Sequence, residues 1–270
     1  MRTPAGRPID LASAEMPVPD GALFMAPHPG QGELLLRLID PSVVDETDPL
    51  SVDPALNAFD PANGFVEALG ASSYAPEFVE RYRAAQRARV ERLDDVARAR
   101  VALSADARAR FKVSGDPVDR RAALAPRLMT VYRTDADLRF VDPSLSPNDR
   151  PYGSLFGRRP DLTNYGLVGF GRLSTADAWL STWSGLSSNA AFVRCASGVQ
   201  VPTLFVELTG DQACFPDDAL EMVDAVGSDD VTQLRVEGTH FGGPIRDGAP
   251  TGASLAAAEI GGWLGERFEA

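Results

Sequence analysis

The sequence predicts an α/β fold in which parallel strands alternate with helices. Three apolar segments carry this prediction, because residues 22–26, 201–208 and 231–238 each have the composition and length of a strand. Helical patterns at 217–226 and 254–268 follow the last two strands. Strands that are joined by a helix pair in parallel, since a tight turn joins only antiparallel neighbours.

Composition narrows the possible partners. The chain has 270 residues, enough for a sizeable core, and a formal net charge of -12, which repels nucleic acid. The first 20 residues contain no apolar leader, and no stretch has the length of a membrane span, so we expect no membrane partner. Cys195 and Cys214 form no disulfide framework and no metal-ligand pattern. We therefore expect a cytoplasmic protein without metal or cofactor.

The N-terminal third begins with an irregular, Pro- and Gly-rich lead-in. The apolar run 22–26 stops at Pro27, as expected for a strand buried on both faces, and the segment after Gly30 can open a short helix. Four Asp-Pro pairs then follow between Asp40 and Pro61. Such pairs favour turns, so this stretch is expected to be a long irregular excursion.

The middle of the chain contains the clearest helical pattern. Apolar side chains recur every three to five residues between Tyr74 and Leu103, which predicts a helix. Residues 127–134 and 136–142 are expected to form a short β-ribbon. The segment from Ser174 to Cys195 is expected to be helical in part. Trp179 and Trp183 would lie on one face of that helix.

The last third has a sharper pattern. The segment 201–208 is apolar and β-branched, and it lies between Pro202 and Gly210. Residues 231–238 alternate in polarity and end in a glycine, and a helix is expected to close the chain. Four apolar side chains of that helix are expected to point inward: Leu255, Ile260, Trp263 and Leu264.

Two polar residues follow the ends of neighbouring predicted strands. Asp211 comes directly after Gly210, and His240 follows the next strand, 29 residues later. Functional groups gather at the carboxyl ends of parallel strands, so a carboxylate and an imidazole are expected at the same edge of the sheet. Such a carboxylate holds one ring nitrogen and stabilises the imidazolium that forms during acyl transfer. We therefore predict that Asp211 lies within hydrogen-bonding reach of His240.

These two loops resemble those of α/β-hydrolases. The acid of that family is an Asp that follows a glycine at the end of a strand, as in TLFVELTGDQACFP. Its histidine follows the end of the next strand, as in VEGTHFG. The run GALFMAPHPG is similar to the strand that follows the nucleophile helix. The resemblance implies a partial α/β-hydrolase fold, with residues 1–40 and 186–270 as the C-terminal part of the core. Residues 41–185 would form a mainly helical cap or lid insertion.

The family's serine nucleophile has no counterpart in this sequence. It belongs to the motif G-x-S-x-G, and Ser154, Ser184 and Ser13 all lack that context. A crossover from the strand that carries the nucleophile to the strand at 22–26 needs a helix. Only 21 residues precede Ala22, and prolines and glycines interrupt them. We therefore expect the nucleophile to be encoded upstream of Met1. The other explanation is a truncated chain that has lost its chemistry.

Several other residues have competing interpretations. Cys214 is three residues from Asp211 and is expected to be a buried structural thiol rather than a nucleophile. His28 follows a strand end and is a candidate for substrate binding, although a simple loop role explains it as well. Phe215 and Phe241 are expected in the core, but they flank the proposed catalytic loops and are further substrate-binding candidates.

The acidic cluster between Asp40 and Asp53 lacks the spacing of a calcium loop, so solvated turns explain it better. Together, these observations predict a serine hydrolase that cleaves an ester, amide or related acyl bond in a small-molecule substrate. Asp211 and His240 would be the acid and base of its triad. The alternative is a non-catalytic remnant that binds a small molecule or a partner chain, including a second copy of itself.

Overall fold

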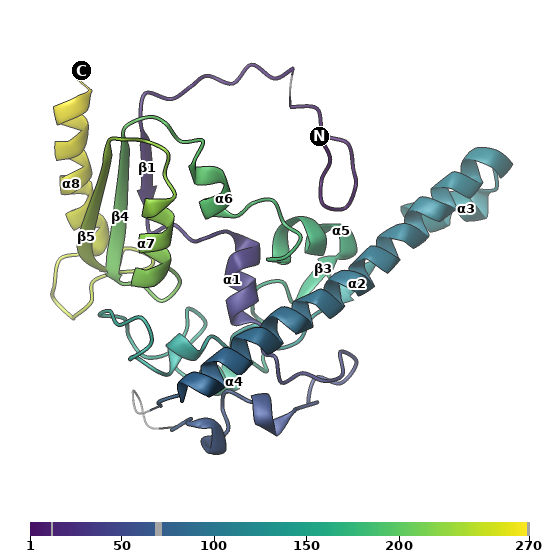
Figure 1. The fold of residues 1–270 in the computed structure, drawn as a ribbon, viewed down its shortest axis with the longest axis horizontal. Coiled ribbons are helices and arrows are strands. Elements are labelled where there is room, and N and C mark those ends of the chain that lie inside the picture. The colour runs from purple at the N-terminus through teal and green to yellow at the C-terminus, as the bar shows by residue number, and fades with distance from the viewer. Residues whose placement is uncertain (12, 68–71, 269–270) are drawn as a thin grey trace.

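Three parallel strands form the sheet that the sequence predicts. The computed structural model describes residues 1–11, 13–67 and 72–268. Strand β4 (Thr203–Gly210) lies between β1 (Ala22–Met25) and β5 (Val231–Thr239), and both pairs are parallel (Figure 1). All three predicted strands are therefore confirmed, and the protein is an α/β protein. Strand β1 is not buried on both faces as predicted, since Leu23 is 46% exposed.

Helices cover both faces of this sheet. Leu204, Val206 and Leu208 of β4 pack against helix α8 (Gly252–Arg267), where Trp263 is buried. The alternating residue Phe205 packs on the opposite face with α7 (Pro216–Asp224). Because successive side chains of a strand point to opposite faces, β4 is buried on both sides. The short helix α6 (Phe192–Ala196) also lies on the α7 face.

One detail of the closing helix differs from the prediction. Leu255 and Ile260 pack against the core as expected, but Leu264 is 44% exposed. Trp263 and Leu264 are adjacent and therefore point about 100° apart around a helix. Since Trp263 faces the sheet, Leu264 is turned towards solvent.

The long connection from β1 to β4 begins with α1 (Gln31–Leu38) and continues irregularly. Two 3₁₀ turns, Pro54–Leu56 and Pro61–Asn63, lie in the Asp-Pro-rich stretch. Asp53 and Asp60 accept hydrogen bonds at 2.9 Å from the backbone N–H groups two residues later. These carboxylates shape turns, as the sequence predicts.

Helix α2 (Pro76–Ser114) is longer than predicted and crosses the molecule diagonally (Figure 1). It buries Tyr82, Val90 and Leu93 near its start. The apolar pattern fades after Val101, but alanine and arginine sustain a helix by intrinsic propensity. The helix ends where Gly115 adopts a left-handed conformation, and α3 (Pro117–Leu124) packs back on its end.

The predicted β-ribbon is wrong in its pairing. Strand β2 (Leu128–Thr130) pairs with β3 (Leu173–Thr175) and not with residues 136–142. That segment forms a 3₁₀ turn, Leu138–Phe140, because Asp137 accepts the backbone N–H of Arg139 at 3.0 Å. Three short helical segments complete this region: α4 (Pro160–Thr163), α5 (Ala176–Ala178) and a π-helical turn (Trp179–Trp183).

Buried ion pairs and hydrogen bonds hold together much of the middle region, which comprises residues 41–185. Arg139 is 5% exposed and bonds to Asp137 at 2.7 Å and to Asp218 of α7 at 2.8 Å. Asp94 of α2 accepts the indole N–H of the buried Trp179 at 2.8 Å. These contacts join segments that are far apart in the sequence, so the middle region depends on polar contacts as well as on apolar packing.

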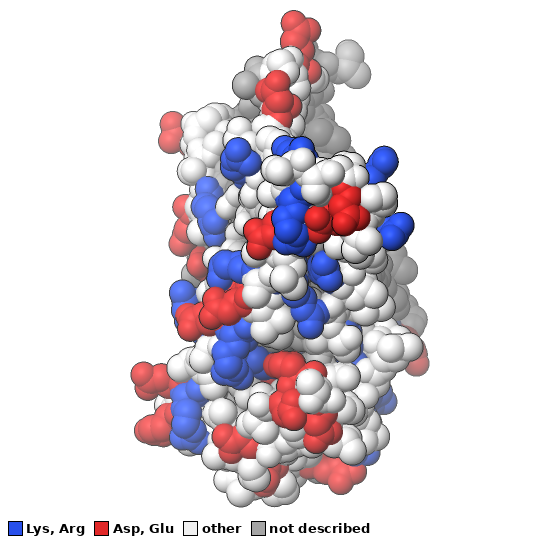
Figure 2. All heavy atoms as spheres, turned by 90° about the vertical axis from the view of Figure 1, so that its right-hand side faces the viewer, with Lys and Arg blue, Asp and Glu red and all other residues white. Residues whose placement is uncertain are grey.

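The surface at the α3 end mixes both signs of charge. Figure 2 shows Lys and Arg side chains interspersed with Asp and Glu on this face, without a broad patch of either sign. In the part of the chain that the structure describes, no helix is both long and apolar enough to cross a membrane.

Candidate active site

The register of the sheet brings the two predicted catalytic residues to the same edge. Gly210 at the end of β4 is aligned with Thr239 at the end of β5, after an irregularity that shifts the pairing between Leu208 and Gly210. Asp211 and His240 are each the next residue along the chain. The two side chains therefore leave neighbouring strands at the same level.

The two side chains meet directly. The Nδ1 atom of His240 lies 3.0 Å from both carboxylate oxygens of Asp211, which confirms the predicted contact. An ionised carboxylate only accepts hydrogen bonds, so Nδ1 carries the proton. In a neutral imidazole this leaves Nε2 unprotonated and able to accept a proton from another group. His240 keeps 18% of its side chain exposed, whereas Asp211 is fully buried.

The structure fixes Asp211 from several sides. Its Oδ1 atom accepts the backbone N–H groups of Ala213 at 2.6 Å and Cys214 at 3.0 Å. These donors compensate the buried negative charge and orient the carboxylate. Asn148 donates from its side chain to the backbone carbonyl of Asp211 at 2.8 Å. No pattern in the sequence indicates this hydrogen bond, since Asn148 lies 63 residues away from Asp211.

His28 is near enough to His240 for the two rings to interact electrostatically. Burial lowers the pKa of His28, and the nearby positive charge of a protonated His240 lowers it further. The ring accepts the backbone N–H of Gly30 through Nδ1 at 3.1 Å. Gly30 has a φ of 117°, and a Cβ there would lie 2.2 Å from the carbonyl oxygen of Ala190. The loop that presents His28 is thus held tightly against the segment before α6.

The two phenylalanines beside the catalytic loops have opposite environments. Phe241 was expected in the core, but it is 81% exposed, with its ring 4.9 Å from that of His240. This position suits the prediction that it borders a substrate. Phe215 is 1% exposed, as its core interpretation predicts, so it offers no surface to a ligand.

Phe215 instead connects the acid loop to the middle region. The guanidinium carbon of Arg139 lies 3.8 Å from the centre of its ring, and that of Arg150 lies 4.9 Å away. Arg139 also bonds to Asp218 on α7. A cation over an aromatic face is stabilising, particularly when it is buried. The loop that carries Asp211 is therefore held by two arginines at Phe215 and by an ion pair at Asp218.

None of the candidate nucleophiles reaches His240. Ser154 donates to Asp135 at 2.8 Å, Ser184 is fully buried and accepts two backbone N–H groups, and Ser13 donates to Asp10. Burial raises the pKa of the Cys214 thiol, and the negative charge of Asp211 raises it further, so the thiol stays protonated. Among residues 1–11, 13–67 and 72–268, no hydroxyl or thiol hydrogen-bonds to the His240 ring.

The acidic side chains between Asp40 and Asp53 shape turns and form ion pairs. Asp45 accepts from Thr47, and Asp48 accepts from the backbone N–H of Leu50, so both shape turns. Glu46 forms an ion pair with the buried Arg89 at 2.7 Å. Within the described ranges, no group of three or more His, Cys, Asp or Glu side chains is arranged to hold a metal ion.

Neither the known family models, nor the curated proteins, nor the solved structures contain a match to this chain. The interpretation of the site therefore depends on its geometry and on the sequence motifs around Asp211 and His240.

Proposed function

We propose that Asp211 and His240 are the acid and base of a catalytic triad that cleaves an ester, amide or related acyl bond. The observation that carries the proposal is the contact between Nδ1 of His240 and the buried Asp211 carboxylate. The fold around it would be the C-terminal part of an α/β-hydrolase, with residues 41–185 as a cap or lid. The serine would come from a segment outside this sequence.

Each residue has a definite role in such a reaction. The Nε2 atom of His240 takes the proton of the serine hydroxyl as the oxygen attacks the acyl carbon. The same atom then returns the proton to the leaving group. Asp211 keeps the ring in the required tautomer and stabilises the imidazolium. Water repeats the cycle on the acyl-enzyme, with His240 again as base.

The residues around the pair support a role in substrate binding. Phe241 presents an exposed aromatic face beside the His240 ring, and His28 interacts electrostatically with the same ring. An acyl substrate could rest on Phe241 while its carbonyl faces the triad. The pocket would be completed by the part of the protein that carries the serine.

The first test concerns the pair itself. In ¹⁵N-labelled protein, the Nδ1 proton of His240 is expected to give a resonance far downfield of the amides. The signal should disappear in His240→Gln and shift upfield in Asp211→Asn, whose side chain is a weaker partner. In Asn148→Ala the signal should still be present, with only a small change in chemical shift. A signal unchanged by Asp211→Asn would contradict the assignment of Asp211.

The second test concerns activity. The chain alone is expected to hydrolyse p-nitrophenyl esters no faster than buffer. The protein extended by its in-frame upstream coding segment is expected to turn them over, with kcat/KM reduced at least about 1,000-fold by His240→Gln. An in-frame stop codon close upstream, or an inactive extended protein, would favour a non-catalytic protein that binds a small molecule or a partner chain.

A further inference from the structure

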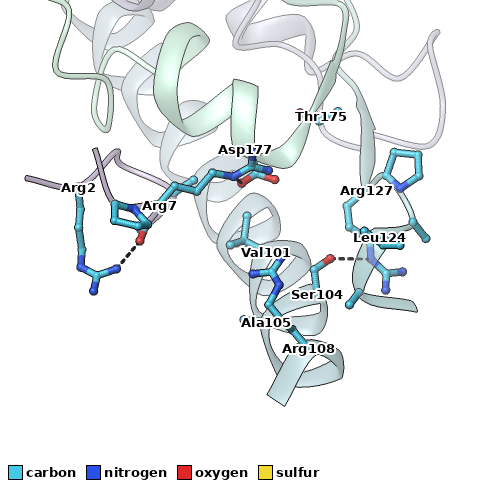
Figure 3. Close-up of a pocket in the computed structure, with 16 residues that line it drawn as sticks. Arg2, Arg7, Val101, Ser104, Ala105, Arg108, Leu124, Arg127, Thr175 and Asp177 are labelled. Carbon is cyan, nitrogen blue, oxygen red and sulfur yellow. Dashed lines mark hydrogen bonds and ion pairs between the residues drawn. The ribbon is translucent and has the colours of Figure 1, made fainter. Parts of the chain in front are cut away.

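A cavity lies away from the proposed catalytic pair. It has a volume of about 460 Å³, which is within the range of small-molecule sites. The N-terminal loop, the second half of α2, the segment after α3 and the start of α5 form its walls (Figure 3). Asp211, His240 and His28 are absent from its lining, so it is separate from the site described above.

The cavity has a concentrated positive charge in an acidic protein. Its described lining includes Arg2, Arg7, Arg108 and Arg127, against the single carboxylate of Asp177. That balance is a net of three positive charges, whereas the whole chain carries -12. Like charges repel one another when they are brought together, so an anion between these guanidinium groups would be stabilised.

Hydrogen bonds hold three of the arginines in place. Arg2 donates to the carbonyl of Gly6 at 2.7 Å, and Arg7 bonds to Asp177 at 3.0 Å. On the opposite wall, Arg127 donates to Ser104 of α2 at 3.3 Å (Figure 3). Anchored guanidinium groups lose little further entropy when a ligand binds, and each still has N–H donors to offer.

Arg108 differs from the other three. It lies on α2 beside Val101 and Ala105, and within the described ranges its guanidinium has no hydrogen-bond or ion-pair partner. All five of its N–H donors are therefore available, and the planar group matches a carboxylate or a phosphate in a two-pronged hydrogen bond.

Apolar side chains complete the lining. Val101, Ala105 and Leu124 contribute apolar surface next to the arginines. We propose that this cavity binds a small organic polyanion, a molecule with two or three carboxylate or phosphate groups on a compact apolar frame. The anionic groups would bond to Arg108 and Arg127, and the frame would lie against α2.

Calorimetric titration of the full chain at low salt tests this proposal. Citrate serves as the carboxylate probe, and pyrophosphate serves as the phosphate probe. At least one of them is expected to bind saturably at one site per chain. Arg108→Gln should weaken that binding about tenfold, because it removes a charge-assisted hydrogen bond to the ligand. Within the described part of the chain, no other side chain loses a partner. Preference for one probe identifies the anionic group.

Two further variants separate the cavity from general surface charge. Ala105→Leu adds volume in the cavity without changing charge and should weaken binding at least fivefold. Arg92→Gln removes a charge from an exposed position on the same helix, 16 residues away, and should change the affinity less than twofold. If neither citrate nor pyrophosphate binds saturably, the proposal is overturned. Equal losses in Arg92→Gln and Arg108→Gln would overturn it as well.

Discussion

The sheet region and the middle region of this protein are stabilised in different ways. Around β4 the core is apolar, with Leu204, Phe205 and Val206 fully buried between helices. In the middle region, charged groups such as Arg139 and Asp137 are almost as deeply buried. Apolar burial is non-directional, whereas a buried ion pair stabilises only with the right partners in place.

The two regions meet at the proposed active site. Asp218 lies on α7 of the sheet region, and it pairs with Arg139 from the middle region. The same arginine covers Phe215, four residues after Asp211. The orientation of the Asp211 carboxylate therefore depends on both regions, because the sheet sets its position and the ion-pair network clamps its loop.

Breaking the ion-pair network should have the largest effect on stability. Arg139→Leu removes the shared partner of Asp137 and Asp218 and leaves both buried carboxylates undercompensated. We expect a loss of about 4 kcal/mol in the free energy of unfolding at pH 7, measured by urea denaturation. Arg92→Leu, at an exposed position on α2, is the control and should cost less than about 0.5 kcal/mol.

The cost of Arg139→Leu should also depend on pH. Burial alone would raise the pKa of Asp137, but Arg139 and Arg83 outweigh it and hold the pKa below its ordinary value. A carboxylate whose folded pKa is lowered stabilises the fold above about pH 4 and loses that contribution as the pH falls further. The difference in the free energy of unfolding between the parent protein and Arg139→Leu should therefore become smaller below about pH 4. A difference that is independent of pH would contradict the stabilising role of the ion pairs of Arg139.

Leu204→Ala should have a somewhat smaller effect on the apolar region. The side chain is fully buried between β4 and α8, so its truncation should cost about 3 kcal/mol through lost burial and a cavity. This cost should not change between pH 3 and pH 7, in contrast to that of Arg139→Leu. Leu23→Ala on β1, where the side chain is 46% exposed, is the control and should cost less than about 1 kcal/mol.

The smallest expected effect concerns His28. Its folded pKa is lowered, so the unfolded chain binds more protons below about pH 6.5, and stability falls as the pH drops through that range. His28→Asn, which keeps an acceptor for Gly30, should make stability less dependent on pH between 5 and 7. His240→Gln should raise the pKa of His28 in an NMR titration. A pKa of His28 at or above its ordinary value would contradict this account.

The apolar region could be predicted from the sequence because its signals are local. Each strand is a short run of apolar residues, and the glycines before Asp211 and His240 mark the ends of two strands. Parallel pairing then follows from the helix between them. The contact between Asp211 and His240 was predictable for the same reason, since adjacent parallel strands bring their carboxyl ends to one edge.

The middle region could not be predicted in the same way. The pairing of β2 with β3 joins segments about 45 residues apart, and the polar turn at Asp137 prevents the nearer pairing. The contact of Arg139 with Phe215 and the hydrogen bond from Asn148 likewise depend on distant partners. Hydrophobic periodicity contains no information about such partners, so the sequence predicts that Phe215 is in the core but does not exclude that it borders a substrate.

Labelling with a fluorophosphonate is the sharpest test of the proposed triad. This probe reacts with serines that a neighbouring histidine has activated. If in-frame coding sequence upstream of Met1 is included in the protein, we expect the label on a serine of that extension, and we expect His240→Gln to abolish labelling. The 270-residue chain should remain unlabelled. Labelling that survives His240→Gln would contradict the assignment of Asp211 and His240 as two members of a triad. A label on a serine within residues 1–270 would contradict the placement of the nucleophile outside this sequence.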